Sequence, residues 1–165
     1  MLFRSSSFPS IIELFSKIPH YFERNSSFKL TSIHKDENIV SLSAILLDDE
    51  YYELLVNGKT LIDGYSVINI ETLILFKIRA WLDFKLQKEN GVELDSRKIN
   101  KHKNDIFRLL VNVVPMRRLE LSTKIQNDVS SFIEKVKDDK PDLKNLDIMT
   151  NFERLVQLLQ SMFLG

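Results

Sequence analysis

The stretch "ETLILFKIRAWLDFKLQ", residues 71–87, decides the fold that we expect for this chain. Apolar residues occur nearly all round a helix built from these residues, where a surface helix would have them along one side only. A helix with apolar residues on every side lies inside a protein, because water would otherwise contact them. We therefore expect residues 71–87 to form a helix around which the other elements pack.

Three amphipathic helices are predicted after it, at residues 96–113, 122–137 and 150–163. Each has apolar residues three and four positions apart, which is the spacing of one helix face. Asp95 or Ser96 is expected to cap the first of the three, because a short polar side chain there accepts a backbone N–H. Thr150 and Glu153 have the spacing of a capping box at the start of the last.

The first part of the chain favours strands. Four short runs rich in β-branched or aromatic residues are predicted to be strands, at residues 1–4, 11–17, 28–33 and 39–47. The fourth run ends fully apolar, as is typical of a central strand covered on both faces. Residues 48–58 have the composition of one or two helical turns, and Asp63-Gly64 predicts a two-residue hairpin turn.

These elements predict a single α+β domain over residues 1–165, with a sheet and hairpin in residues 1–70 and helices in residues 71–165. At 165 residues and 44% hydrophobic, the chain is long enough for one core.

Composition excludes several classes of protein and site. Lys plus Arg and Asp plus Glu both number 23, so the net charge favours neither a polyanion nor a membrane surface, and a nucleic-acid site would be a local patch. The absence of cysteine excludes disulfides, thiolate zinc sites and cysteine nucleophiles. The four glycines form no phosphate-binding loop, and no serine stands in a hydrolase motif. Charges interrupt every long apolar run and no signal peptide is indicated, so we expect a cytoplasmic protein without membrane contact.

Lys77 is the first candidate site residue, because helical spacing surrounds its ammonium with apolar residues. Two interpretations are open. The side chain packs its stem and extends its charge to water, or it points into a cleft and holds a phosphate. Arg79 and Asp83, four residues apart on the same helix, are expected to form an ion pair.

The segment "DSRKINKHKNDIFR", residues 95–108, is the densest basic stretch. Charge runs of this kind are usually solvated helix faces. His102 and Asp105 are three apart, which suits either a hydrogen-bonded pair or two ligands. No third ligand lies nearby in the sequence, so no metal site is predicted.

Two groups of acidic residues have open interpretations. Glu13 lies inside the apolar run "IIELF"; it is paired or liganded if that strand is interior, and solvated if the strand is at an edge. The acids of residues 48–53 are expected in the first turn of a helix, where the backbone dipole favours negative charge.

Four segments together resemble the latter part of bacterial nucleotidyltransferase-fold proteins, in particular the uncharacterised relatives of the abortive-infection (AbiEii-type) toxins. These segments are "FPSIIELFSK", "SLSAILLDDEYYELL", "LIDGYSVINIETLILFKIRAWLDF" and "DSRKINKHKNDIFRLL". The resemblance covers about residues 1–115 and lies in the order and spacing of the segments. It implies a nucleotidyltransferase-like protein related to toxin–antitoxin or phage-defence systems.

The resemblance also implies roles for individual residues. Lys77 matches the family's helical lysine, Asp105 matches its aspartate on the next helix, and Glu13 fits the third carboxylate of the fold. A nucleotide or nucleic-acid site would then consist of Lys77 and the basic residues of the next helix, which are Arg97, Lys101, His102 and Arg108.

The chain departs from the family at the catalytic signature. A Gly-Ser or Gly-Gly turn followed by a helix and a strand with two acids would precede the "LFR" run, and the 165 residues contain no match to it. Those acids hold the two Mg²⁺ ions that bridge the nucleotide phosphates. We therefore expect a truncated or degenerate form without independent catalytic activity, needing Mg²⁺ and a nucleoside triphosphate only if an active site is completed.

Three interpretations remain open at this point. The chain is a non-catalytic nucleotide-binding or tRNA-binding protein, or it is half of a nucleotidyltransferase completed by another chain, or it is a non-enzymatic protein-interaction domain. Loss of the first strands would expose a sheet edge, and exposed edges favour pairing. A homodimer or a partner chain covering that edge is therefore expected.

Overall fold

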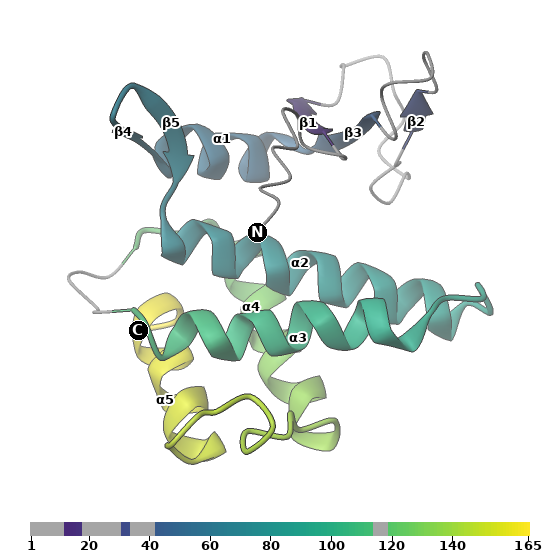
Figure 1. The fold of residues 1–165 in the computed structure, drawn as a ribbon, viewed down its shortest axis with the longest axis vertical. Helices are drawn as coiled ribbons and strands as arrows, with labels where there is room; N and C mark the ends of the chain where they lie inside the picture. Colours follow the sequence, from purple (N-terminus) through teal and green to yellow (C-terminus); the bar gives the residue numbers. More distant parts are fainter. Residues whose placement is uncertain (1–11, 18–30, 34–41, 114–118) are drawn as a thin grey trace, which may run out of the picture. The chain divides into compact units, whose positions relative to one another are not determined.

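A computed structural model of the chain describes residues 12–17, 31–33, 42–113 and 119–165 (Figure 1). The fold is α+β, as predicted. The chain divides into two compact units, residues 1–52 and 53–165, which are described separately below. The strand predicted at residues 1–4 lies outside the described residues.

The first unit contains a three-stranded sheet with the order β1-β3-β2. Its strands are β1 (Ile12–Lys17), β2 (Thr31–Ile33) and β3 (Leu42–Leu47). Strand β3 pairs in parallel with β1 and antiparallel with β2, so β3 is central, as its apolar end predicted. Strand β1 lies at the edge of the described sheet, with Glu13 paired to Ser43 in the ladder.

Helix α1 (Asp49–Asn57) follows β3 after one residue. The Tyr51 backbone N–H donates to the Asp48 carboxylate over 3.1 Å, so Asp48 caps the helix. Asp49 and Glu50 lie in the first turn, as predicted for this acidic group, and Asp49 forms an ion pair with Lys17 of β1 at 2.9 Å.

Strands β4 (Lys59–Ile62) and β5 (Tyr65–Ile68) form the predicted hairpin in the second unit. Asp63 and Gly64 have φ angles of 51° and 81°, the left-handed values that a two-residue turn requires. At the base of the hairpin, the Asn69 N–H donates to the Gly58 carbonyl over 2.8 Å.

After the hairpin, the described residues of the second unit form four helices (Figure 1). They are α2 (Ile70–Glu89), α3 (Ser96–Leu110), α4 (Thr123–Asp138) and α5 (Phe152–Phe163). Helix α2 packs against α3 and α4, and none of its residues before Leu86 is exposed, as its apolar residues predicted. Trp81 of α2 is fully buried and meets the Phe132 ring of α4 edge to face, with ring centroids 5.1 Å apart. No helix among the described residues is apolar over enough of its length to span a membrane.

Short polar side chains cap these helices. Asp95, one of the two predicted residues, caps α3 and accepts the Arg97 N–H over 2.9 Å. The capping box predicted for α5 is wrong by one residue, because Asn151 is the cap and accepts the Arg154 N–H over 2.8 Å. Glu153 instead forms an ion pair with Lys140 at 3.3 Å.

A buried cation joins α3 to the end of α4. The side chain of Lys103 is only 5% exposed, and its ammonium donates to both the carbonyl and the carboxylate of Asp139, the residue that caps α4. Lys85 of α2 pairs with the same carboxylate at 2.8 Å. Burial alone would raise the pKa of Asp139, but the hydrogen bonds from Lys103 and Lys85 outweigh it and hold this pKa below its ordinary value. Three helices therefore meet at one carboxylate.

We predict that Lys103→Met lowers the free energy of unfolding by about 1–3 kcal/mol, because it leaves the Asp139 carbonyl without its donor and removes one of two cations from the carboxylate. Urea denaturation at neutral pH measures this. Lys137→Met is the matched control, since Lys137 is exposed on α4. Equal stability of the two variants would contradict a structural role for the Lys103 contact.

Candidate functional site

Lys77 of α2 and Asp105 of α3 lie in contact, although they are 28 residues apart in the sequence. The Lys77 ammonium donates to Asp105 Oδ2 over 2.8 Å. The two side chains are 23% and 22% exposed, so the pair lies at the edge of the core and not within it. The Lys77 ammonium neither extends freely into water nor points into a cleft. It contacts the Asp105 carboxylate, which is itself partly exposed to solvent.

Further basic residues of α3 lie beside this pair. Arg108 Nη1 is 3.8 Å from Asp105 Oδ1, and its side chain is 55% exposed. Lys101 is exposed on α3 one turn before Asp105. We call Lys77, Lys101, His102, Asp105 and Arg108 the Lys77 cluster. It contains three permanent cations and one carboxylate, so the cluster has an excess of positive charge.

His102 is the neutral member of the cluster. Its imidazole packs against the Phe84 ring, with centroids 5.3 Å apart, and its Nδ1 is buried with no hydrogen-bond partner in the described structure. Burial, and next the charge of Lys77, lower the pKa of His102 to about 4. The side chain is therefore uncharged near neutral pH.

Of the two arrangements that the spacing of His102 and Asp105 suits, a hydrogen bond between them is not present in the described structure. Asp105 Oδ2 accepts from Lys77 instead, because α2 brings an ammonium to the carboxylate from across the helix interface. Among the described residues, no three His, Asp or Glu side chains form a group that could hold a metal ion. The Lys77 cluster therefore supplies charge and hydrogen-bond donors.

The other predicted site residues lie elsewhere. Arg97 is at the first turn of α3, where Arg97 Nε pairs with Asp95 Oδ2 at 3.2 Å and the side chain is 92% exposed. Arg108 lies eleven positions further along the helix, a rise of about 16 Å. Glu13 is on β1 in the first unit, and its side chain lies outside the described part of the structure.

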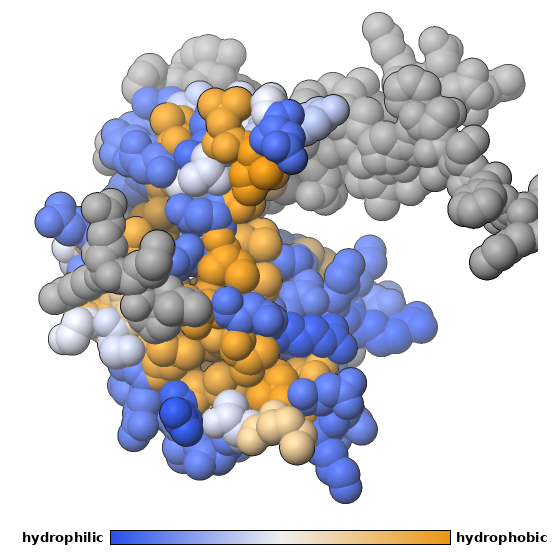
Figure 2. Space-filling model, turned by 60° about the vertical axis from the view of Figure 1, so that its left-hand side comes forward, coloured by the Kyte–Doolittle hydropathy of each residue, from blue (hydrophilic) through white to orange (hydrophobic). Residues whose placement is uncertain are grey.

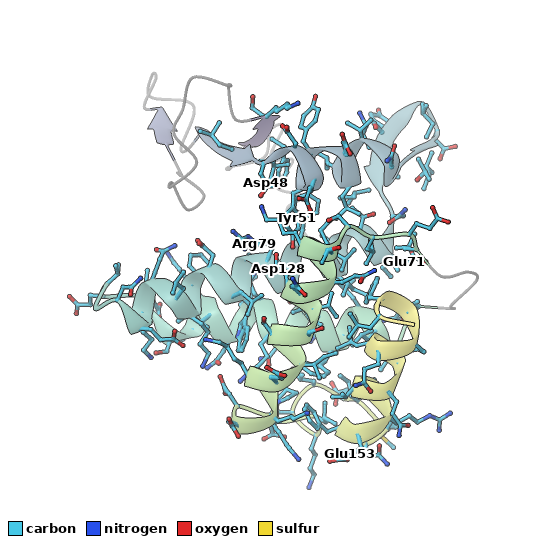
Figure 3. All side chains as sticks on the ribbon, turned by 180° about the vertical axis from the view of Figure 1, so that it is seen from behind. Asp48, Tyr51, Glu71, Arg79, Asp128 and Glu153 are labelled. Atoms are coloured by element: carbon cyan, nitrogen blue, oxygen red, sulfur yellow. The ribbon has the colours of Figure 1, made fainter. Side chains whose placement is uncertain are left out.

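The ion pair predicted between Arg79 and Asp83 is also wrong. Arg79 Nη1 lies 3.4 Å from Asp128 Oδ2 of α4, and Figure 3 shows the two side chains next to each other. Asp83 instead accepts a 2.6 Å hydrogen bond from Gln87 on its own helix. A partner on a packed neighbouring helix outcompetes the partner one turn away.

An open groove lies between the end of α3 and α5, and no pattern in the sequence predicts it. Its volume is about 710 Å³, and its lining residues are Leu110, Val111, Val113, Met149, Thr150, Arg154, Leu155, Gln157, Leu158 and Ser161. Figure 2 shows hydrophobic side chains over much of this side of the helical unit. The groove is mainly apolar, and none of the residues in the Lys77 cluster lines it.

Comparisons of the chain with protein-family models, with curated proteins and with solved structures found no match.

We predict that stability decreases as the pH falls from about 6.5 to about 4, because His102 has a lower pKa when folded than when unfolded. The unfolded chain binds the proton first in this range, so acid favours unfolding. His102→Phe keeps a ring against Phe84 and should flatten this part of the stability profile, measured by urea denaturation across the range. Lys101→Ala is the control and should keep the slope; an unchanged slope in His102→Phe would contradict the prediction.

Proposed function

We propose that this chain is a nucleotidyltransferase-like protein that binds a nucleotide or a nucleic-acid phosphate at the Lys77 cluster without transferring a nucleotide on its own. The observation that carries the proposal is the contact between Lys77 and Asp105. These are the two helical residues that the resemblance matched, and they come from different helices.

The charge of the cluster supports an anionic ligand. Lys77 and Arg108 share a single carboxylate, so a phosphate that approaches from solvent would find donors only partly neutralised by Asp105. His102 is neutral and therefore adds no further positive charge beside Lys77 and Arg108. Arg97 and Lys101 extend the same helix stripe, which suits a longer ligand such as tRNA.

The absence of independent transfer rests on the sequence. Transfer in this superfamily uses two metal ions held by neighbouring acids, and the 165 residues contain no match to the motif that supplies them. The Lys77 cluster offers one carboxylate, so we assign no metal-dependent step to it. A role in toxin–antitoxin or phage-defence systems follows from the resemblance alone and is part of the proposal.

Nucleotide binding is tested by calorimetric titration of the chain with nucleoside triphosphates. Lys77→Gln should weaken binding about tenfold, the cost of one charge-assisted hydrogen bond. Lys88→Gln is the matched control, because Lys88 is exposed near the end of the same helix. If no nucleotide binds, and Lys77→Gln changes only stability, the interaction-domain interpretation is favoured.

Transfer is tested by incubating the chain with labelled triphosphates, Mg²⁺ and bulk tRNA. We expect no incorporation of label above that of a heat-denatured sample. Incorporation that disappears in Glu13→Ala would contradict the proposal and show that the chain completes an active site.

A further inference from the structure

The hairpin of β4 and β5 ends in an exposed apolar tip. Leu61, Ile62 and Tyr65, which lie within two residues of the turn, expose 78%, 57% and 75% of their surface. Asp63 in the turn is also exposed, and it is the only charged residue from Thr60 to Ile68. Its carboxylate forms no ion pair with any residue that the structure describes. The tip is therefore a protruding apolar surface with one negative charge at its end.

The groove between the end of α3 and α5 has the complementary character. It is hollow, with a volume of about 710 Å³, and its lining residues are mainly apolar. Two of them, Val111 and Met149, expose 46% and 100% of their surface. Arg154 is the only charged residue in the lining, and its guanidinium forms no ion pair within the described part of the chain. The groove is therefore a concave apolar surface with one positive charge.

The tip and the groove fit each other in size and charge. A two-residue turn is the narrow end of a hairpin whose strands lie about 4.8 Å apart. A volume of about 710 Å³ is in the range of sites that hold a ligand the size of a few side chains. A carboxylate brought to Arg154 gains charge-assisted hydrogen bonds. Because Leu61 and Tyr65 are exposed, the tip does not fill the groove of its own chain, so a second copy must supply it.

The hairpin and α5 lie on the same side of the second unit. Both are at the left of Figure 1, and Figure 2 brings this side forward. A two-fold axis between them turns the hairpin of one copy toward the groove of the other, and it brings the second hairpin to the first groove at the same time. Two identical contacts therefore form together, and the assembly closes at two copies.

We propose that this chain forms a dimer in which the hairpin tip of each copy enters the groove between α3 and α5 of the other. Asp63 of one copy pairs with Arg154 of its partner at each of the two contacts. The tip covers Val111 and Met149, so exposed apolar surface of both copies is removed from water.

An exchange of charges tests the contact, with sedimentation velocity of the full chain over a range of concentrations as the measurement. Arg154→Glu or Asp63→Lys alone places like charges together at both contacts, and each should weaken the dimer by about tenfold or more. In a mixture of the two variants every contact pairs opposite charges, so the mixture should dimerise as the wild type does. Gln160→Glu adds a negative charge on α5 outside the groove lining and should leave the dimer unchanged.

A milder variant separates the charge of Asp63 from the shape of the turn. Asp63 has a φ angle of 51°, which lysine adopts less readily than aspartate or asparagine. Asp63→Asn keeps the turn and removes the charge, so it should also weaken the dimer. Combined with Arg154→Glu, it removes the repulsion, and the double variant should dimerise more tightly than Arg154→Glu alone.

A monomeric wild-type chain at the highest concentration reached would overturn the proposal. A dimer that Arg154→Glu leaves intact would also overturn it, as would a mixture of the two charge variants that stays monomeric. These substitutions lie outside the Lys77 cluster, so nucleotide binding by Arg154→Glu should equal that of the wild type. The dimer and the proposed function can therefore fail separately.

Discussion

The second unit depends on the enclosure of α2 by α3 and α4. A helix packed on these sides has little solvent-facing surface for its charges, yet α2 carries charged residues along its whole length. A charge at such an interface is stable only if it has a partner, and for three of the charges of α2 a neighbouring helix supplies it. Lys77 finds Asp105 on α3, Arg79 finds Asp128 on α4, and Lys85 finds Asp139 at the end of α4. The apolar side chains bring the helices together, and these pairs define how the helices align.

The predicted elements agree closely with the structure where the signal is local. The hairpin follows from Asp63-Gly64, the central strand from the apolar end of "SLSAILL", and the buried helix from the composition of "ETLILFKIRAW". Each of these signals lies within a few consecutive residues, so the sequence alone is enough to predict the hairpin, the central strand and the buried helix. The helix boundaries differ by only a few residues because the competing caps are adjacent, as Thr150 and Asn151 are.

The errors concern partners that are distant in sequence. Helical spacing predicts Asp83 as the partner of Arg79 and allows Asp105 as a partner of His102, because spacing is all that a sequence reveals about side-chain neighbours. In the structure α4 presents Asp128 to Arg79, and α2 presents an ammonium to Asp105 before His102 can use it. The Lys103–Asp139 contact has no signal in the sequence for the same reason, since neither residue stands out in its own segment.

The hairpin tolerates substitution less at Gly58, where it begins, than at Gly64 in its turn. A Cβ at this position would lie 2.2 Å from the Thr72 hydroxyl oxygen, whereas a Cβ at Gly64 would meet nothing within 4 Å. Any side chain at Gly58 would push the strands away from the first turn of α2, so the root of the hairpin is sterically locked. The exposed strands beyond it carry no such restriction. Over evolutionary time, substitutions can therefore accumulate in those strands while Gly58 and the first turn of α2 keep their arrangement.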